Sequence, residues 1–153
     1  MLDRLRISVK DDRGFTLVEL LVVILIIGIL AAIAIPSFLA QKGKAYDASA
    51  KEMVRTGAEA AETYSTDHDG EYTGMTAAAL HEYEPRIQTE AGNGNAYLSV
   101  ATEAEGGRGY EVTAVAPGAG KDTFTITRKA DGEVVRSCKA EGANKGGCET
   151  GTW

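Results

Sequence analysis

The stretch RGFTLVELLVVILIIGILAAIAIPSF, residues 13–38, decides how the rest of the chain is interpreted. Residues 15–35 are apolar apart from Thr16 and the carboxylate of Glu19. As a helix, this segment spans about 31 Å at ~1.5 Å per residue, which matches the bilayer hydrocarbon core of about 30 Å. Because an ionised carboxylate in hydrocarbon costs roughly 2.5 kcal/mol or more, Glu19 is expected to serve a function.

Two other interpretations of the apolar segment carry less support. An ordinary secretory signal would be cleaved after the small residues of Ala32-Ile33-Ala34, and its basic region would be formed by Arg4, Arg6, Lys10 and Arg13. The segment is long for such a signal and carries Glu19, and this cleavage would discard a helix that continues downstream. A buried core helix is disfavoured because 153 residues offer little with which to cover a helix that is apolar on every side.

Composition limits the remaining function classes. Beyond the apolar segment the chain suffices for one small domain, rich in Gly, Ala and Thr and therefore thin in its core. A net charge of −6 argues against a general nucleic-acid footprint, although a local basic patch stays open. No nucleophile with a base, phosphate loop or spaced carboxylate pair is apparent, so the sequence predicts no catalytic residue, cofactor or metal site.

The motif Gly14-Phe15-Thr16-Leu17-Val18-Glu19-Leu20, between a short charged leader and an apolar helix, resembles the type IV pilin and pseudopilin family. The resemblance covers residues 1 to about 66. It implies that a prepilin peptidase cleaves between Gly14 and Phe15 on the cytoplasmic side, and that the new Phe15 amine is N-methylated.

The resemblance also implies a partner for Glu19, namely the Phe15 amine of an adjacent subunit. Such a pair is better understood as a register device than as net stabilisation, because desolvation can cancel the Coulombic gain. It would couple assembly to cleavage, since the uncleaved Phe15 nitrogen is an uncharged amide. The alternative is that Glu19 only lies among lipid headgroups near the cytoplasmic face.

Gly28 and Pro36 interrupt the apolar helix. A proline inside a helix removes a hydrogen bond and clashes with the preceding turn, so a kink is expected at Pro36. The resemblance implies that the helix between the two residues loosens when subunits pack into a filament. Tolerated irregularity of a membrane helix is the alternative, above all for Gly28.

After Pro36 the sequence is amphipathic, with a small and aromatic stripe that is expected to pack on a sheet. The stripe consists of Tyr46, Ala50, Met53, Val54, Gly57, Ala61 and Tyr64, and the charged residues expected on other faces are Asp47, Lys51, Arg55, Glu59 and Glu62. The helix is expected to end near Asp69-Gly70. Asp67, Asp69 and Glu71 lack the spacing of a calcium loop, so a solvated turn is favoured, with cation binding left open.

Residues 67–153 are predicted to form a globular head. Thr76 caps a short helix over residues 76–83, and alternating patterns predict antiparallel strands at residues 96–102, 110–116, 123–129 and 133–139. Phe124 and Ile126 are expected on the face toward the long helix, and Thr123, Thr125 and Thr127 on the other.

The two cysteines, Cys138 and Cys148, are predicted to form a disulfide loop in an extracytoplasmic domain. A zinc site would need ligands beyond two cysteines and the distant His68 and His81, and two free thiols are the other alternative. The place of Trp153 is undecided between the disulfide loop and a filament surface.

These observations predict an α+β, type IV pilin-like fold, with a long N-terminal helix on a small antiparallel sheet of about four strands. The expected divisions are a cleaved leader (1–14), a transmembrane or filament-core helix (15–36), its amphipathic continuation (37–66) and the head (67–153). The basic leader favours a single-pass precursor in the cytoplasmic membrane with its N-terminus inside. The mature form is expected in an extracellular pilus filament.

The predicted function is that of a structural subunit, a major pilin that polymerises with itself. By resemblance, its partners are the prepilin peptidase and methyltransferase, an assembly platform protein, an assembly ATPase and, before assembly, the lipid membrane. The alternatives are a type II secretion-like pseudopilin or minor pilin, a secreted binding module behind an ordinary signal peptide and, more distantly, an enzyme.

Overall fold

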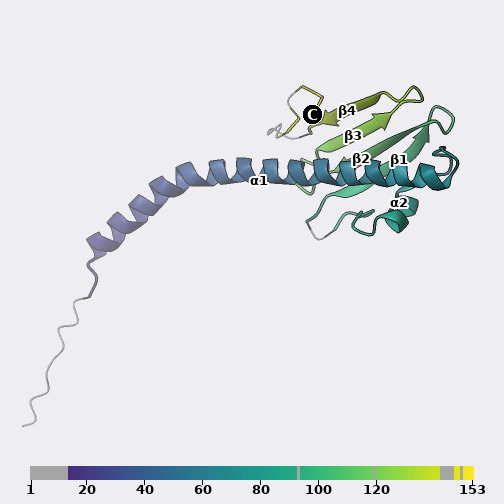
Figure 1. The fold of residues 1–153 in the computed structure, drawn as a ribbon. Coiled ribbons are helices and arrows are strands. Elements are labelled where there is room, and N and C mark those ends of the chain that lie inside the picture. Colours follow the sequence, from purple (N-terminus) through teal and green to yellow (C-terminus); the bar gives the residue numbers. More distant parts are fainter. Residues whose placement is uncertain (1–13, 93, 119, 142–146, 149) are drawn as a thin grey trace, which may run out of the picture. The chain divides into compact units, whose positions relative to one another are not determined.

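The computed structural model describes residues 14–92, 94–118, 120–141, 147–148 and 150–153 (Figure 1). The predicted leader therefore lies outside the described residues, except for Gly14. The chain divides into two compact units, Met1–Ser37 and Phe38–Trp153. Helix α1 (Leu17–Asp67) contributes residues to both units.

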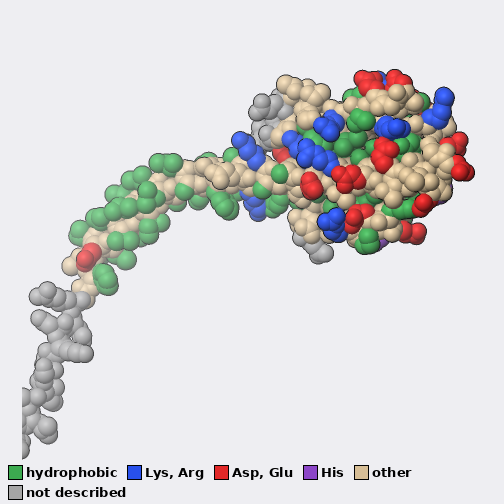
Figure 2. Space-filling model, in the orientation of Figure 1, with side chains coloured by type: hydrophobic (Ala, Val, Ile, Leu, Met, Phe, Trp, Pro, Cys, Tyr) green, Lys and Arg blue, Asp and Glu red, His purple; other side chains and the backbone are tan. Residues whose placement is uncertain are grey.

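In the first unit, α1 presents apolar side chains to its surroundings. Its large hydrophobic residues are exposed on every side of the helix, from Leu17 at 73% to Ile35 at 58%. Figure 2 shows one face of this apolar surface. An 18-residue window of α1 has a mean hydropathy of 3.1 and no buried residue, so its length and composition suffice to cross a membrane. Pro36 lies inside the helix without ending it, and the kink expected there stays a prediction.

In the second unit, α1 is amphipathic and one face of it is buried, as predicted. Most of the predicted stripe is fully or partly buried. The prediction was wrong for Asp47, which is only 4% exposed. Its carboxylate accepts a hydrogen bond from a residue 100 positions away, and a local pattern carries no information about such a contact.

The sheet is an antiparallel meander with the strand order β1-β2-β3-β4. Its strands are β1 (Tyr97–Ala104), β2 (Gly109–Val115), β3 (Thr123–Arg128) and β4 (Val134–Lys139). Helix α2 (Ala77–Tyr83) precedes β1 and is capped by the Thr76 hydroxyl, which accepts from the Ala79 N–H at 3.1 Å. The predicted α+β architecture and all four strands are confirmed.

The core lies between α1 and the sheet. Phe124 and Ile126 of β3 are buried as expected, and Leu98 and Val112 lie on the same side in β1 and β2. Gly57 of α1 approaches these two side chains so closely that a Cβ there would lie 2.8 Å from a methyl carbon of each. The small residue therefore sets how near the helix comes to the sheet.

We expect Gly57→Val to destabilise the second unit by about 1–3 kcal/mol, because extra methyl groups would overpack this contact. A control is Ala58→Val, one position along α1, where Ala58 is only partly buried. The free energy of unfolding of both variants, measured by urea denaturation, tests this. Equal stability of the two variants would contradict the close-approach role of Gly57.

Candidate functional site

The start of α1 holds the carboxylate singled out by the sequence. The Thr16 Oγ1 accepts from the Glu19 N–H at 3.2 Å, and the Glu19 Oε2 accepts from the Thr16 N–H at 3.5 Å. This reciprocal arrangement is a capping box, which satisfies two N–H groups that have no partner within the helix. The Thr-x-x-Glu spacing could have predicted it from the sequence, where it was overlooked.

The capping box places Glu19 in the first turn of α1, at the N-terminal end of its apolar part. Both Glu19 and Thr16 are exposed, and Phe15 is 88% exposed beside them. The contact from the Thr16 N–H is at the long end of hydrogen-bond distances, so the carboxylate retains capacity for a stronger donor. An ammonium group near residue 15 would be such a donor.

Two glycines were also predicted to act, Gly28 within α1 and Gly14 just before Phe15. A Cβ at Gly28 would meet no atom within 4 Å, and the same holds for Gly14. Neither glycine is therefore required by packing among the described residues. The cleavage, methylation, register and helix-loosening roles of these positions stay predictions.

The C-terminal part of the chain is fixed at three points. Cys138 and Cys148 form a disulfide with a Cα–Cα distance of 5.7 Å. The Cys138 N–H donates to the Gly151 carbonyl at 2.8 Å, and the Trp153 Nε1–H donates to the Ser137 carbonyl at 2.9 Å. The last residues thus run back along β4, and Trp153 packs edge-on against Phe124.

A fourth attachment joins the C-terminal part to α1 through Gly147. The Asp47 Oδ2 accepts from the Gly147 N–H at 2.8 Å, and the Lys51 Nζ donates to the Gly147 carbonyl at 2.9 Å. Burial raises the pKa of Asp47, and the nearby Asp122 carboxylate adds to this rise. A Cβ on Gly147 would lie 2.6 Å from the Lys51 Nζ, so a side chain there would require the flexible Lys51 side chain to shift.

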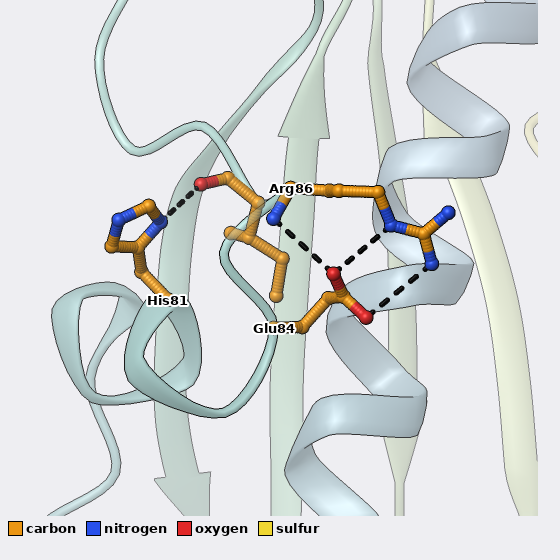
Figure 3. Close-up of polar contacts among 4 residues, drawn as sticks. His81, Glu84 and Arg86 are labelled. Carbon is orange, nitrogen blue, oxygen red and sulfur yellow. Dashed lines mark hydrogen bonds and ion pairs between the residues drawn. The ribbon is translucent and has the colours of Figure 1, made fainter.

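Both histidine rings are hydrogen-bonded to backbone carbonyls within the second unit. The His81 Nδ1 lies 2.7 Å from the Ile87 carbonyl oxygen, next to the ion pair of Glu84 and Arg86 (Figure 3). The His68 Nδ1 lies 2.8 Å from a backbone carbonyl oxygen of α1. Among the described residues, no group of three or more His, Cys, Asp or Glu side chains is placed to hold a metal ion, the acidic turn after α1 included.

Comparison with known proteins gives one family model and several relatives. The model described as "Prokaryotic N-terminal methylation motif" matches residues 9–35. The type IV wide pilus major component PilA4 of Thermus thermophilus is 39% identical over 71 residues, 46% of this chain and 53% of that protein. The type IV major pilin protein PilA of Myxococcus xanthus is 33% identical over 87 residues, 54% of this chain and 40% of that protein.

A third relative is similar along nearly its whole length. The type II secretion system core protein G of Vibrio cholerae is 29% identical over 151 residues, covering 95% of this chain and 94% of that protein. No solved structure matches the chain significantly. The match spans about half the length of each of the two pilins named above, 53% and 40%. It carries the prepilin-type N-terminal methylation motif and is homologous to type IV pilins and to a type II secretion pseudopilin.

Proposed function

We propose that this protein is the structural subunit, as a major pilin, of a type IV pilus. The observation that carries the proposal is the exposed apolar part of α1 with a carboxylate at its start. Large exposed apolar surface needs either lipid or other protein around it. Lipid would cover the helix in the precursor, and the helices of other subunits would cover it in the filament.

Glu19 would direct the packing of these helices. In the precursor its carboxylate is held by an uncharged N–H of the same chain. After cleavage at Gly14-Phe15, the Phe15 ammonium of a neighbouring subunit would offer a charge-assisted hydrogen bond, which is roughly twice as strong as a neutral one. Exchange of partners would thereby fix the position of one helix along the next and make assembly depend on cleavage.

The proposal includes specific partners, namely a prepilin peptidase and methyltransferase, an assembly platform protein and an assembly ATPase. It also includes two locations of the chain. The precursor would lie in the cytoplasmic membrane with its N-terminus inside, and the mature form would lie in an extracellular filament. The helix between Gly28 and Pro36 would loosen during packing, and Pro36 would allow a change of direction there.

A pseudopilin of a type II secretion-like system is the second candidate. It is favoured by the match to core protein G, which spans 94% of that relative, whereas the pilin matches span 53% and 40%. Electron microscopy of sheared filaments, with mass spectrometry of the main subunit, separates the two. Long and abundant surface fibres built of this chain indicate a major pilin, and their absence from cells that contain the cleaved chain indicates a pseudopilin.

We expect the mature chain to begin at Phe15 with a methylated amine. Intact-mass measurement and N-terminal fragmentation of filament material test this. The matched control is Gly14→Val, which removes the proposed cleavage residue and leaves the apolar helix unchanged, so the uncleaved chain is expected to accumulate in the membrane. A mature chain that starts at Ile35 would instead establish an ordinary signal peptide and contradict the proposed function.

A further inference from the structure

Three cationic groups converge on one indole ring in the second unit. The Lys51 Nζ, Arg55 Cζ and Arg136 Cζ lie 5.7, 5.2 and 5.6 Å from the ring centroid of Trp153. We name Lys51, Arg55 and Arg136 the basic cluster. Two of these residues come from α1 and one from β4, and Lys and Arg side chains gather beside α1 on the face that Figure 2 shows.

Asp47 lies near enough to Lys51 to interact with it electrostatically, but no member of the basic cluster belongs to an ion pair among the described residues. The four ion pairs among the described residues use Arg86, Arg128, Lys129 and Lys139 as their cations. Cation–π attraction to one ring offsets only part of the repulsion among three like charges. Arg55 and Arg136 are exposed, so an anionic surface can reach them.

The opposite charge gathers farther along the same unit. At the end of α1 and just after it, and at the end of β1 and in the turn that follows, lie five carboxylates that take part in none of those four ion pairs. We name them the acidic end: Asp67, Asp69, Glu71, Glu103 and Glu105. The Tyr72 N–H donates to the Gly107 carbonyl at 2.7 Å and the Gly74 N–H to Glu103 at 3.2 Å, so the two segments lie together.

The electrostatics of α1 make the acidic end more negative still. A helix C-terminus carries a partial negative charge, which cationic side chains usually offset. The last turn of α1 has no basic residue and ends at Asp67.

The two patches are far apart on one subunit. Because Lys51 and Asp67 are 16 residues apart on one helix, the basic cluster and the acidic end are separated by about 24 Å along the axis.

We propose that the basic cluster of one subunit binds the acidic end of another copy of this chain in the filament. This inference rests on the proposed function. It adds to the pairing of Glu19 and Phe15 a second contact, between the second units of neighbouring subunits. The two patches differ, so the interface is heterologous and repeats from subunit to subunit without closing. Complementary charge of this kind chiefly sets register and association rate.

A polyanion such as a nucleic acid fits the basic cluster less well. The chain carries a net charge of −6, which opposes the approach of a long anion. Base stacking would need a free aromatic face, and Trp153 already contacts three cations and the ring of Phe124. A second copy brings its own carboxylates at the high local concentration of a polymer.

The test reverses each patch separately and then both together. Arg55→Glu with Arg136→Glu reverses the basic cluster and leaves Lys51 on the Gly147 carbonyl. Asp67→Lys with Glu71→Lys reverses the acidic end, where a lysine also suits the helix terminus. The control reverses two exposed cations outside both patches, Arg86→Glu with Lys121→Glu, and circular dichroism and thermal unfolding check that every variant is folded.

We expect each patch variant to lower filament yield at least tenfold and to lower the salt concentration at which filaments dissociate. The combined variant is expected to recover most of the yield, and the control variant to match the unmodified chain. If both patch variants polymerise normally, or if the combined variant fails as they do, the inference is overturned. If the variant with the reversed basic cluster forms normal filaments but no longer binds heparin, the cluster binds a polyanion and the inference is overturned. A cleaved, unmodified chain that forms no filaments contradicts the proposed function itself.

Discussion

Replacing Glu19 by Ala is expected to leave the chain inserted in the membrane and cleaved at Gly14-Phe15, yet to lower filament yield by about a hundredfold or more. Insertion should not suffer, because an expensive carboxylate has been removed from an apolar segment. Assembly should suffer because the neighbouring Phe15 ammonium would enter the helix bundle unpaired, and breaking half of a buried pair typically costs about 3–5 kcal/mol. The membrane pool, cleaved fraction and sheared filaments are quantified in parallel.

Glu19→Gln separates the capping role seen in the structure from the pairing role that we propose for this side chain. Glutamine also serves at this position of a capping box, so the bond from the Thr16 N–H is retained while the charge is lost. We expect Glu19→Gln to assemble as poorly as Glu19→Ala. Normal filaments from the glutamine variant would assign Glu19 to helix capping, and normal filaments from a cleaved alanine variant would remove it from assembly altogether.

Loss of the disulfide is expected to have the largest effect on the head. Replacing both Cys138 and Cys148 by Ser should lower the free energy of unfolding by roughly 2–4 kcal/mol, the usual range for closing a short loop. Urea denaturation of the full chain in detergent, with and without reductant, measures this loss.

Reductant supplies the control for the serine substitutions, because Cys148 is buried and a hydroxyl in its place adds a cost of its own. The reduced unmodified chain should lose stability without this added cost, and the double variant should not respond to reductant at all. Equal unfolding midpoints for the oxidised and reduced unmodified chain would show that the disulfide contributes nothing to stability.

Local patterns in the sequence predicted most of the fold. The alternation around Phe124 and Ile126 located β3, and the Thr76 hydroxyl located the start of α2, because both signals depend on neighbours a few residues away. The capping box at Thr16 and Glu19 also depends on near neighbours, but the prediction from the sequence did not include it.

Contacts between distant parts of the chain could not be predicted. The burial of Asp47 depends on Gly147, and the position of Trp153 depends on Ser137 and on cations of α1. A helical pattern assigns a charged residue to the solvent face unless a partner is known, and these partners lie at the other end of the chain. The patch of charge around Trp153 was hidden for the same reason, since the composition as a whole is acidic.

The attachment of Gly147 to α1 has a practical use. Asp47 and Lys51 recognise only the main-chain N–H and carbonyl of Gly147, and the disulfide begins at the next residue. This anchorage therefore makes no demand on the side chains chosen for residues 142–146. A short epitope or dye-binding peptide encoded there would leave both main-chain contacts in place and would tag each copy of the chain once, which would allow the proposed filaments to be labelled in living cells.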